Sequence, residues 1–499
     1  MTPRGTRLGQ LLQLAGVRPL APVGLDPEVR GITLDSRRVT RGDVFCAIRG
    51  LRTDGEAYVA EAVTRGAVAI LAASPRPPSL DAAVAWVRVT EPRLAGARIA
   101  REHFGRPDAA LTLVGVTGTN GKTTTVYLLE AIALAGERRA GRIGTVGYAH
   151  AGQERAATRT TPEATELYRL LAEMRDARVE LVAMEVSSHA LALYRVEGAH
   201  FAVAAFLNLG RDHFDFHEDA TAYFEAKARL FDGLGSEQTA VLPADTPHGE
   251  QLRRRTRARV LSFGRTPAAQ VRLLDERCEL TGSSAKLETP WGSTQLRTHL
   301  PGRFNLDNVA AAAACALAAG LPLEAVARGV DALRVVPGRL ERIEQGQPFT
   351  VFVDYAHTEA ALENVLTGLR ELTAGGRLLV VFGCGGERDP GKRPGMGRIA
   401  ATGADLVFLT SDNPRGEDPE RILDEIARGV AEVPGGPQRC RRLADRGEAI
   451  AAAVAAARAG DVLIIAGKGH EATQESGGTA RAFDDRRVAA SALGETRRA

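Results

Sequence analysis

Residues 111–129 read LTLVGVTGTNGKTTTVYLL, in which an apolar run leads into a glycine-rich turn and then into a second apolar stretch. The first run predicts a buried strand, and the stretch from Lys122 predicts a helix. The turn between them would direct several backbone N–H groups and a helix N-terminus at one point, which suits a triphosphate. The glycine spacing departs from the strict Walker consensus, which has Gly where this chain has Val116. The segment therefore predicts a variant phosphate loop.

Two side chains of this loop have direct roles in phosphate chemistry. The ammonium group of Lys122 supplies a point charge for the β- and γ-phosphates, and the hydroxyl of Thr123 can ligate Mg²⁺. The alternative is a turn that only caps a helix, but a lysine and three threonines have no packing reason to cluster there. The loop residues expected to contact the nucleotide are Gly118, Thr119, Asn120, Gly121, Lys122, Thr123 and Thr124.

Apolar runs that alternate with helical stretches after residue 111 indicate a buried parallel sheet. Open α/β sheets bind ligands just past the carboxyl ends of such strands. Glu185 ends one run and should lie beside the phosphate-loop strand, where its carboxylate can hold Mg²⁺. His213 follows another run in NLGRDHFDFH (208–217), a segment too charged for a purely structural role, and is the best candidate for a second metal ligand. His217 could equally be a structural histidine.

The length of 499 residues and the changes of pattern along the chain predict three domains and an α/β fold class. Residues 1–108 should form a small N-terminal α/β domain. Residues 109–337 should form a central ATP-binding domain, with a mainly parallel sheet and an antiparallel extension. Residues 338–499 should form a Rossmann-like α/β domain, whose strand-to-loop junctions are FTVFVDYAH, RLLVVFGCGG, DLVFLTSDNPR and DVLIIAGKGHE.

The bulk composition narrows the function classes. With 44% hydrophobic residues, 25% charged residues and a net charge of +3, the chain is typical of a globular protein and has no footprint for nucleic acid. No apolar stretch suits a signal peptide or a membrane span, so we expect a cytoplasmic protein without membrane insertion. We also expect a monomer. Five scattered cysteines without a CxxC pair indicate neither disulfides nor a zinc site. The arginine run at 253–259 is more simply a solvated face than a phosphate site.

An ordered set of motifs across nearly the whole chain resembles the Mur ligase family. These motifs are GVTGTNGKTTT, TTPEA, MEVSSHA, NLGRDHFDFH, YFEAKARLF, PGRFNLDNVAAA, VPGRLERI, VFVDYAHT, FGCGGERDPGKRPGM, TSDNPR and AGKGHE. The resemblance is strongest to the members that add the third residue of the peptidoglycan peptide. It implies an ATP-dependent ligase that converts a carboxylate of UDP-N-acetylmuramoyl-L-alanyl-D-glutamate into an acyl phosphate, which an amine then attacks. It also implies two Mg²⁺ ions that offset the repulsion between the anions.

The resemblance assigns further residues to the nucleotide and the metal ions. Lys227 would be carbamylated by CO₂, which turns a cation into an anionic oxygen ligand. Asn305 and Asn308 would hold the adenine, whereas Arg339 would face the γ-phosphate and Asp354 the ribose. Because these residues lie in different domains, catalysis should require closure. The expected metal ligands are Thr123, Glu185, His213 and Lys227, and the expected catalytic residues are Lys122, Glu185, His213, Lys227 and Arg339.

The resemblance also implies contacts for the UDP-sugar peptide. Those residues are Ser36 in the uridine pocket and, around the sugar-peptide and its phosphates, Thr160, Thr161, Ser187 and Arg195. The chain has Leu51 and Leu193 where many relatives carry His and Gln. Two polar contacts to this substrate therefore differ from the family pattern.

The choice of amino acid rests on one arginine. L-Lysine and meso-2,6-diaminopimelate differ by a distal carboxylate, which a guanidinium binds in a bidentate manner. Arg415 in DNPR can supply that guanidinium, and the motif resembles the diaminopimelate-adding members, so we expect meso-diaminopimelate. Glu471 can pair with the distal ammonium group. The full set expected at this pocket is Arg388, Asp412, Asn413, Pro414, Arg415, Gly467 and Glu471.

Three alternatives stay open on the sequence alone. A lysine-adding ligase or a folylpolyglutamate synthetase would use the same phosphate loop with another amine. For Arg415 itself, the alternative to a substrate contact is a surface ion pair. A nucleotide-gated binding protein would use the loop as a switch and form no amide product. The charged segment at 208–217, Lys227 and the DNPR motif argue against that third class.

Overall fold

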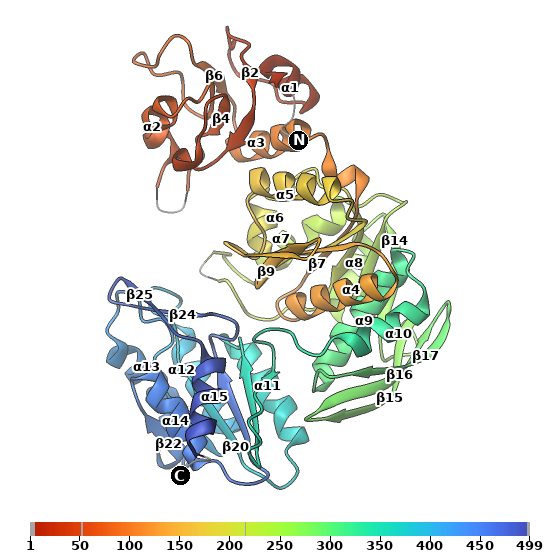
Figure 1. Cartoon of the computed structure of the whole chain (residues 1–499), viewed down its shortest axis with the longest axis vertical. Helices are drawn as coiled ribbons and strands as arrows, with labels where there is room; N and C mark the ends of the chain where they lie inside the picture. The colour runs from red at the N-terminus through yellow and green to blue at the C-terminus, as the bar shows by residue number, and fades with distance from the viewer. Residues whose placement is uncertain (1–4, 51–52, 215, 497–499) are drawn as a thin grey trace.

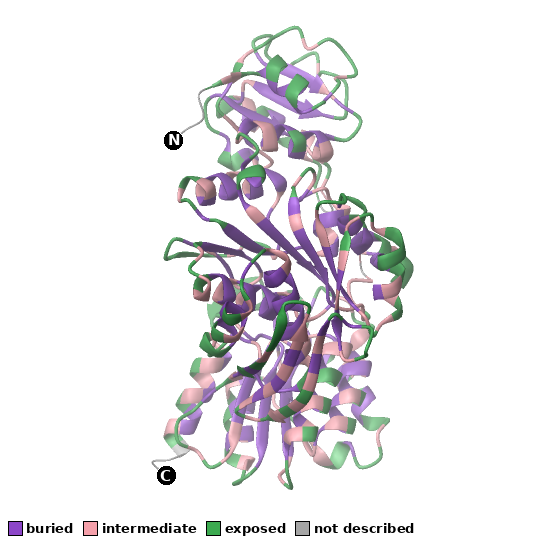
Figure 2. Cartoon of the chain, turned by 90° about the vertical axis from the view of Figure 1, so that its right-hand side faces the viewer, coloured by how far each residue is buried: buried purple, intermediate pink, exposed green. Residues whose placement is uncertain are grey.

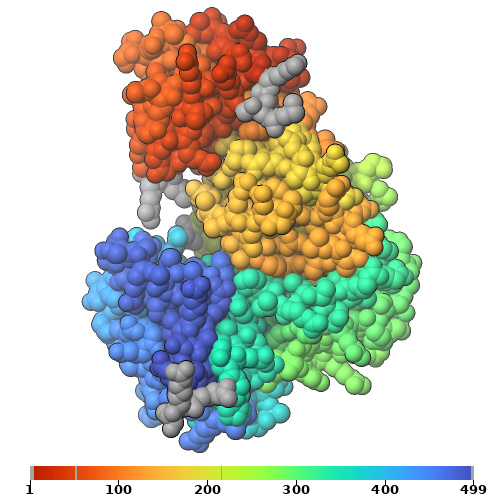
Figure 3. Space-filling view, in the orientation of Figure 1, coloured from red at the N-terminus to blue at the C-terminus, as the bar shows by residue number. Residues whose placement is uncertain are grey.

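The computed structural model describes residues 5–50, 53–214 and 216–496, and Leu51 lies outside these described residues. The chain folds into three α/β units that follow one another along the long axis of the molecule, from red through yellow and green to blue in Figure 1. In each unit the strands are mostly buried, whereas the outer faces of the helices are exposed (Figure 2). Figure 3 shows the N-terminal and C-terminal units packed against the central unit. This is the α/β class that the sequence predicts.

The N-terminal unit is built on a parallel sheet in the order β3-β4-β5-β6. Its strands are β1 (Thr6–Arg7), β2 (Glu28–Val29), β3 (Gly31–Thr33), β4 (Asp43–Cys46), β5 (Ala69–Ala72) and β6 (Ala85–Arg88). Its helices are α1 (Leu8–Leu14), α2 (Val59–Thr64) and α3 (Pro92–His103). Arg93 and Arg98 on α3 form ion pairs with Glu163 and Glu197 of the central unit, at N–O distances of 3.2 and 2.9 Å. These pairs tie the two units together.

The central unit contains one sheet of 11 strands in the order β10-β9-β8-β11-β7-β12-β13-β14-β15-β16-β17. The parallel strands are β7 (Thr112–Thr117), β8 (Ala140–Ile143), β11 (Leu181–Glu185), β12 (Phe201–Phe206), β13 (Thr239–Pro243) and β14 (Arg259–Gly264). β15 (Val271–Glu279) pairs in parallel with β14. Antiparallel pairing then extends the sheet at both edges, through β9 (Gly147–His150), β10 (Gln153–Ala156), β16 (Gly282–Thr289) and β17 (Gly292–Thr298). The antiparallel extension that the sequence predicts is therefore confirmed.

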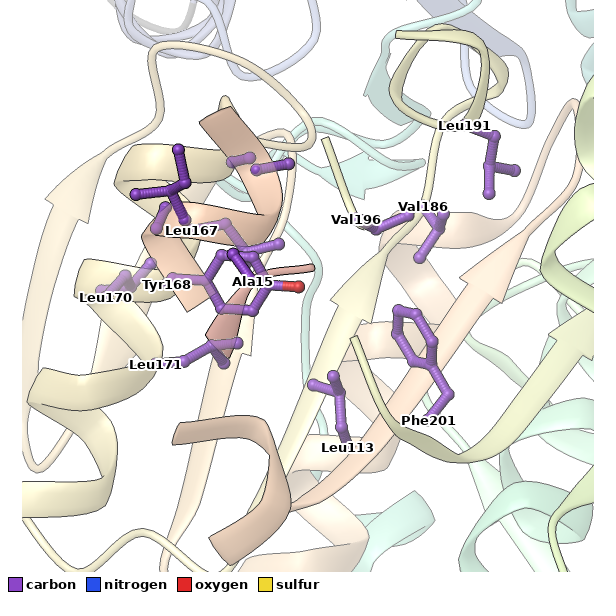
Figure 4. Packing of buried hydrophobic residues seen from close by; sticks show 14 of the residues in the cluster. Ala15, Leu113, Leu167, Tyr168, Leu170, Leu171, Val186, Leu191, Val196 and Phe201 are labelled. Carbon is purple, nitrogen blue, oxygen red and sulfur yellow. The ribbon is translucent and has the colours of Figure 1, made fainter. Parts of the chain in front are cut away.

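Alternate residues of β7 point into two different cores, as the period of a strand requires. Leu113 packs with α5 (Ala164–Asp176) on one face, and Figure 4 shows it beside Leu171 of that helix and Phe201 of β12. Val114 packs on the other face with the helices α4 (Lys122–Ala135), α9 (Arg303–Ala318) and α10 (Leu323–Ala332). The helices α6 (Ser188–Ala192), α7 (Ala220–Asp232) and α8 (Pro247–Arg255) complete the unit. The strand that leads into the phosphate loop is thus held between two packed layers.

The C-terminal unit has a sheet in the order β18-β19-β23-β20-β21-β22, in which only the β18–β19 pair is antiparallel. Its strands are β18 (Glu341–Arg342), β19 (Thr350–Asp354), β20 (Leu378–Phe382), β21 (Leu406–Leu409), β22 (Cys440–Arg442) and β23 (Val462–Ala466), with a hairpin of β24 (Thr473–Ser476) and β25 (Thr479–Ala482). Its helices are α11 (Glu359–Leu372), α12 (Lys392–Gly403), α13 (Pro419–Ala431), α14 (Arg446–Ala456) and α15 (Asp485–Thr496). The four strands predicted from the sequence are β19, β20, β21 and β23.

The carboxyl ends of three central strands meet at one edge of the sheet. β11 and β12 both pair in parallel with β7, so that Glu185 lies opposite Val116 and Phe206 lies opposite Thr117. The predicted position of Glu185 beside the phosphate-loop strand is therefore confirmed. No helix within the described residues is long and apolar enough to cross a lipid bilayer.

Candidate active site

The phosphate loop is fixed by its own glycines and by an asparagine from the next strand. Gly121 has φ +88° and precedes α4, and a Cβ at this position would lie only 2.1 Å from Oδ1 of Asn308. Asn208, just after β12, accepts a hydrogen bond from the Asn120 N–H at 2.9 Å and donates one to the Asn120 carbonyl at 3.1 Å. A larger residue at Gly121 or the loss of the Asn208 amide would disturb the loop. The prediction of a helix from Lys122 is confirmed.

Two lysine ammonium groups converge on the same carbonyl of this loop. Nζ of Lys122 donates to the carbonyls of Gly118 and Thr119, both at 2.8 Å. Nζ of Lys227, on α7, donates to the same Gly118 carbonyl at 2.9 Å. Burial and the neighbouring Lys122 hold the pKa of Lys227 well below its ordinary value, and burial also lowers the pKa of Lys122. The lowered pKa favours the uncharged amine at Lys227, so that Lys122 and the backbone N–H groups are the groups of this loop that would face an anion.

Glu185 forms the acidic side of the site. This carboxylate is 1% exposed and accepts hydrogen bonds from the N–H and hydroxyl of Thr145, at 2.8 and 3.1 Å. The hydroxyls of Thr145 and Thr160 are 3.0 Å apart, so that a predicted substrate contact adjoins the carboxylate. Within the described residues, no group of three or more His, Cys, Asp and Glu side chains is arranged to hold a metal ion. A metal ion would have to draw ligands from Thr123, phosphates or a modified lysine as well.

His213 and Asp212 lie on the loop after β12. The Nε2 atom of His213 is 3.3 Å from Oδ2 of Asp212, and the backbone of His213 is in the left-handed region at φ +57°. Burial lowers the pKa of His213 to about 4, so that the neutral imidazole is present at neutral pH and has a lone pair for a metal ion. Burial alone would raise the pKa of Asp212, but His213, His357 and Lys122 hold it below its ordinary value. His217 contacts Ser188 at 3.0 Å in a buried position, which fits its structural interpretation.

A cavity of about 520 Å³ joins the central and C-terminal units. Arg339 reaches the phosphate loop from the start of the C-terminal unit, where its Nη2 atom donates to the Thr123 hydroxyl at 3.0 Å. Its guanidinium also lies 4.6 Å from the centre of the Tyr355 ring. The predicted residues that line this cavity are Thr119, Asn120, Gly121, Lys122, Thr123, Thr124, Thr160, Glu185, Ser187, His213, Lys227, Asn305, Asn308, Arg339 and Asp354. One space therefore collects most residues predicted for the nucleotide and metal ions.

One end of this cavity has the chemistry of a base pocket. Phe263 and Phe304 provide apolar surface, and the buried amides of Asn305 and Asn308 contact each other at 3.1 Å. Asp354 lines the cavity, and its two carboxylate oxygens accept the N–H groups of Leu340 and Ala356, at 2.7 and 2.8 Å. These bonds anchor the start of the C-terminal unit, and the contact of Asp354 with a ribose stays a prediction.

The residues predicted for the sugar-peptide fall into two places. Thr161 donates to the Glu185 carbonyl at 2.8 Å and accepts the Ser187 N–H at 3.1 Å, and Arg195 donates to the Thr161 carbonyl at 3.2 Å. Arg195 also pairs with Glu163 at 3.0 Å, the carboxylate that holds Arg93 of the N-terminal unit. The buried Ser36 instead lies in the N-terminal unit.

Ser36 donates to Glu61 at 2.8 Å and stays apart from the cavity wall. The departure at Leu193 falls at the C-terminal end of α6. The departure at Leu51 lies outside the described residues.

The residues predicted for the amino acid form a second group, at the carboxyl ends of β21 and β23. Nδ2 of Asn413 donates to Oε2 of Glu471 at 2.9 Å. Arg415 donates to the Gly386 carbonyl at 2.6 Å and lies 3.4 Å from the Glu475 carboxylate. We name Asn413, Arg415, Lys468 and Glu471 the amino-acid cluster. The structure thus brings together segments that are nearly 60 residues apart in the sequence.

The other predicted residues surround this cluster. A Cβ on Gly467, which has φ +116°, would lie 2.5 Å from Oδ2 of Asp412, and a Cβ on Gly385 would lie 3.8 Å from the Arg388 side chain and from the carbonyl of Asn413. Pro414 lies between Asn413 and Arg415 in the same loop. The ring of His470 is 5.1 Å from that of Tyr355, which lines the cavity, so the cluster adjoins the phosphate site.

Sequence reasoning missed several residues of the site. Thr145 holds Glu185 from a short turn that has no motif. Tyr355 and His357 line the cavity from the VFVDYAHT motif, in which only Asp354 was predicted. Lys468 lies inside the GKGHE motif between two predicted residues, and its burial, 0% exposed, gave no signal in the sequence. For Tyr355, His357 and Lys468 the available signal is a predicted residue in the same motif, whereas Thr145 has no such neighbour in the sequence.

Comparison with family models covers most of the chain. Residues 28–104 match the model described as Mur ligase family, catalytic domain. Residues 116–316 match the Mur ligase middle domain, and residues 338–469 match the Mur ligase, glutamate ligase domain. These matches fall on the three α/β units in chain order.

Curated relatives match along almost their whole length. The UDP-N-acetylmuramoyl-L-alanyl-D-glutamate–2,6-diaminopimelate ligase of Solibacter usitatus is 44% identical over 494 residues, which are 97% of this chain and 98% of the relative. The enzyme of the same name from Geobacillus kaustophilus is 43% identical over 478 residues, which are 95% of this chain and 96% of the relative.

Solved structures agree with these relatives. A structure of a UDP-N-acetylmuramoyl-L-alanyl-D-glutamate–2,6-diaminopimelate ligase is 31% identical, with a TM-score of 0.68 and 99% of both chains covered. The MurF ligase of Thermotoga maritima, in complex with ADP, is 21% identical with a TM-score of 0.64, over 94% of this chain and 99% of that one, and supports the fold alone. The chain therefore belongs to the Mur ligase family.

Proposed function

We propose that this protein uses ATP to join meso-diaminopimelate to UDP-N-acetylmuramoyl-L-alanyl-D-glutamate, in the synthesis of the peptidoglycan precursor. The observation that carries the proposal is the single cavity in which the phosphate-loop Lys122, the carboxylate of Glu185 and the buried amine of Lys227 meet. Both substrates are taken from the names of relatives that are 40–44% identical across the chain. The amino-acid cluster next to the cavity supports the same assignment.

The reaction has two steps. In the first, a carboxylate oxygen of the UDP-linked substrate attacks the γ-phosphorus of ATP, and ADP leaves. In the second, the amine attacks the acyl carbon, loses a proton, and phosphate leaves from a tetrahedral intermediate. The backbone N–H groups of the phosphate loop, Lys122 and Arg339 would neutralise the charge on the phosphates. Because Arg339 comes from the C-terminal unit, the charge would be complete only with that unit closed on the loop.

The donor set fits two Mg²⁺ ions. Thr123 and Glu185 offer oxygen ligands, and the neutral imidazole of His213 offers nitrogen. Magnesium would supply charge neutralisation between the ATP phosphates and the incoming carboxylate. Lys227 fits this set only as a carbamate, since an ammonium group repels a cation. Its lowered pKa supports that modification, because the uncharged amine is the form that attacks CO₂ and then loses a proton.

The remaining predicted residues would bind the three substrates. Asn305, Asn308 and Asp354 would contact the nucleoside of ATP. Ser36, Thr160, Thr161, Ser187 and Arg195 would contact the UDP-sugar peptide. Arg388, Asp412, Asn413, Pro414, Arg415, Gly467 and Glu471 would surround the amino acid. We further propose a cytoplasmic monomer with domains at 1–108, 109–337 and 338–499.

The direct test is to incubate the protein with ATP, Mg²⁺ and the UDP-linked dipeptide and to offer meso-diaminopimelate or L-lysine in separate reactions. We expect ADP and a product heavier by one diaminopimelate less water, identified by mass spectrometry. Product with L-lysine alone would overturn the choice of amino acid. ATP cleavage without any amide product would overturn the proposal and favour a nucleotide-gated binding protein.

A further inference from the structure

Lys468 is a buried cation at the centre of the amino-acid cluster. It follows β23 between Gly467 and Gly469, both of which have positive φ angles, +116° and +51°. Its side chain is 0% exposed, which is rare for a lysine. Burying an ammonium group costs free energy unless every donor finds a strong acceptor. The chain therefore has to offset this cost with specific contacts.

Those contacts go to two residues predicted to bind the amino acid. Nζ of Lys468 donates to Oδ1 of Asn413 and to Oε2 of Glu471, each at 3.0 Å. Oδ1 of Asn413 also accepts the N–H of Glu475 at 3.0 Å. With two donors fixed on its oxygen, the Asn413 amide has one orientation, in which Nδ2 points to Oε2 of Glu471. Lys468 thus orients the amide as well as the carboxylate.

The two oxygens of Glu471 are consequently unequal. Oε2 accepts from both Lys468 and Asn413, at 3.0 and 2.9 Å. Oε1 has no hydrogen bond or ion pair to any residue that the structure describes. The carboxylate is also partly exposed, at 31% for its side chain, so that a ligand can reach it. Oε1 is therefore the atom that can accept a hydrogen bond from a ligand ammonium group.

When Glu475 is counted with the amino-acid cluster, the two cations and two carboxylates cancel, which suits a zwitterion. Lys468 compensates Glu471, and Arg415 lies 3.4 Å from the carboxylate of Glu475. The distal end of meso-diaminopimelate carries one ammonium and one carboxylate group, and so brings no net charge. Without Lys468, neither the Glu471 carboxylate nor the Asn413 amide would be held in the orientation that presents Oε1 of Glu471 to a ligand.

We propose that Lys468 is a positioning residue that sets selectivity for the distal ammonium group of the amino acid. It acts through Glu471, whose Oε1 atom it presents to the ligand, and through Asn413, whose amide it orients. The inference rests on the proposed function and deepens it. The competing explanation is that Lys468 only stabilises the C-terminal unit.

The test compares two amines that differ at one group. 2-Aminopimelate keeps both carboxylates and the reacting amine of meso-diaminopimelate but lacks the distal amine. We measure kcat/KM for each amine in the wild type, Lys468→Met, Lys468→Gln and Glu471→Gln. Lys286→Met is the matched control, because Lys286 pairs with Glu288 at 2.9 Å on β16, outside the site. KM for ATP and the melting temperature are measured for every variant.

We expect the wild type to prefer meso-diaminopimelate, and Lys468→Met to reduce that preference at least about tenfold, the scale of one lost charged hydrogen bond. The reduction should come from KM for meso-diaminopimelate, with KM for ATP unchanged. In the Glu471→Gln background, Lys468→Met should change the preference no further, since both substitutions remove the same contact. Lys468→Gln, which keeps an N–H donor, serves if Lys468→Met does not fold.

An unchanged preference in a folded Lys468 variant would overturn the inference, because stability alone lowers both rates equally. If the wild type forms no amide with meso-diaminopimelate, the proposed function fails instead. The two failures are therefore distinguishable.

Discussion

The phosphate loop and the amino-acid cluster treat positive charge in opposite ways. At the loop, the Lys122 side chain donates to the carbonyls of Gly118 and Thr119 and hydrogen-bonds to no carboxylate within the described residues. In the cluster, Lys468 pairs with Glu471. The loop is prepared for a highly charged anion, whereas the cluster is prepared for a ligand with balanced charges. Binding of the nucleotide phosphates thus belongs to the central unit, and selection of the amino acid belongs to the C-terminal unit.

The largest effect should follow from removing the loop charge. Lys122→Met keeps the length of the side chain but leaves the phosphates without their ammonium partner, so we expect kcat to fall about 10³-fold. The measurement is ADP release together with amide product at saturating substrates. Lys286→Met, on β16, should keep full activity. Full activity of Lys122→Met would contradict the role of the phosphate loop in the reaction.

Substitution of Lys227 tests whether carbamylation gives this side chain a negative charge. We expect Lys227→Ala to lose about 10²-fold in kcat, as for one lost electrostatic contact at a reacting centre. With ¹³CO₂ at pH 8, the wild type should give a carbamate signal by NMR, because burial lowers the pKa of Lys227 and so favours its uncharged amine. The variant should give no such signal. A wild type that is equally active after thorough CO₂ removal would contradict the assignment.

The cluster is probed by its arginine. Arg415→Ala should raise KM for meso-diaminopimelate about 30-fold or more, because the distal carboxylate loses its charged partner, while KM for ATP stays unchanged. Arg415→Lys should recover only part of the loss, since an ammonium group lacks the bidentate fork. Arg398→Ala is the control in the same unit, where Arg398 pairs with Glu432 at 3.0 Å. An equal rise of KM for meso-diaminopimelate and KM for ATP would contradict a specific contact between Arg415 and the amino acid.

The smallest effect concerns stability and involves His470, which lies between the phosphate site and the amino-acid cluster. Burial, with Arg339 and Arg486 nearby, lowers the pKa of His470 from 6.5 to about 4. Between pH 6.5 and 4 the unfolded chain binds a proton at this residue that the folded chain resists, so stability falls as the pH falls. The contribution is at most about 1.4 kcal/mol per pH unit. Melting temperatures of the wild type and His470→Gln should diverge in this window, with the variant less sensitive to acid. Parallel curves would contradict the assignment.

The sequence was most informative where chemistry is local. The phosphate loop could be predicted because a strand, its glycines and a helix occupy one continuous segment. The position of Glu185 could be predicted because parallel strands bring their carboxyl ends to one edge. The four C-terminal strands followed from apolar runs that end in polar residues.

The remainder depends on contacts between distant segments. The contact of Arg339 with Thr123 joins residues 216 positions apart, and no local pattern encodes it. The burial of Lys227 follows from packing of α7 on the loop, whereas its helical sequence alone resembles an exposed surface. Lys468 was missed for the same reason. The family resemblance supplied Arg339 and Lys227, but the pairing within the amino-acid cluster required the structure.

The carboxylate of Glu163 connects a predicted sugar-peptide contact to the orientation of the N-terminal unit. Glu163 holds Arg195, a predicted substrate contact, and Arg93, which belongs to α3. If the diphosphate of the UDP-linked substrate bound Arg195, Glu163 would pair with Arg93 alone. That ion pair between the N-terminal and central units would then be stronger. The orientation of the N-terminal unit relative to the central unit should then differ between the free and the substrate-bound protein. Small-angle X-ray scattering can therefore detect binding of the sugar-peptide without catalysis.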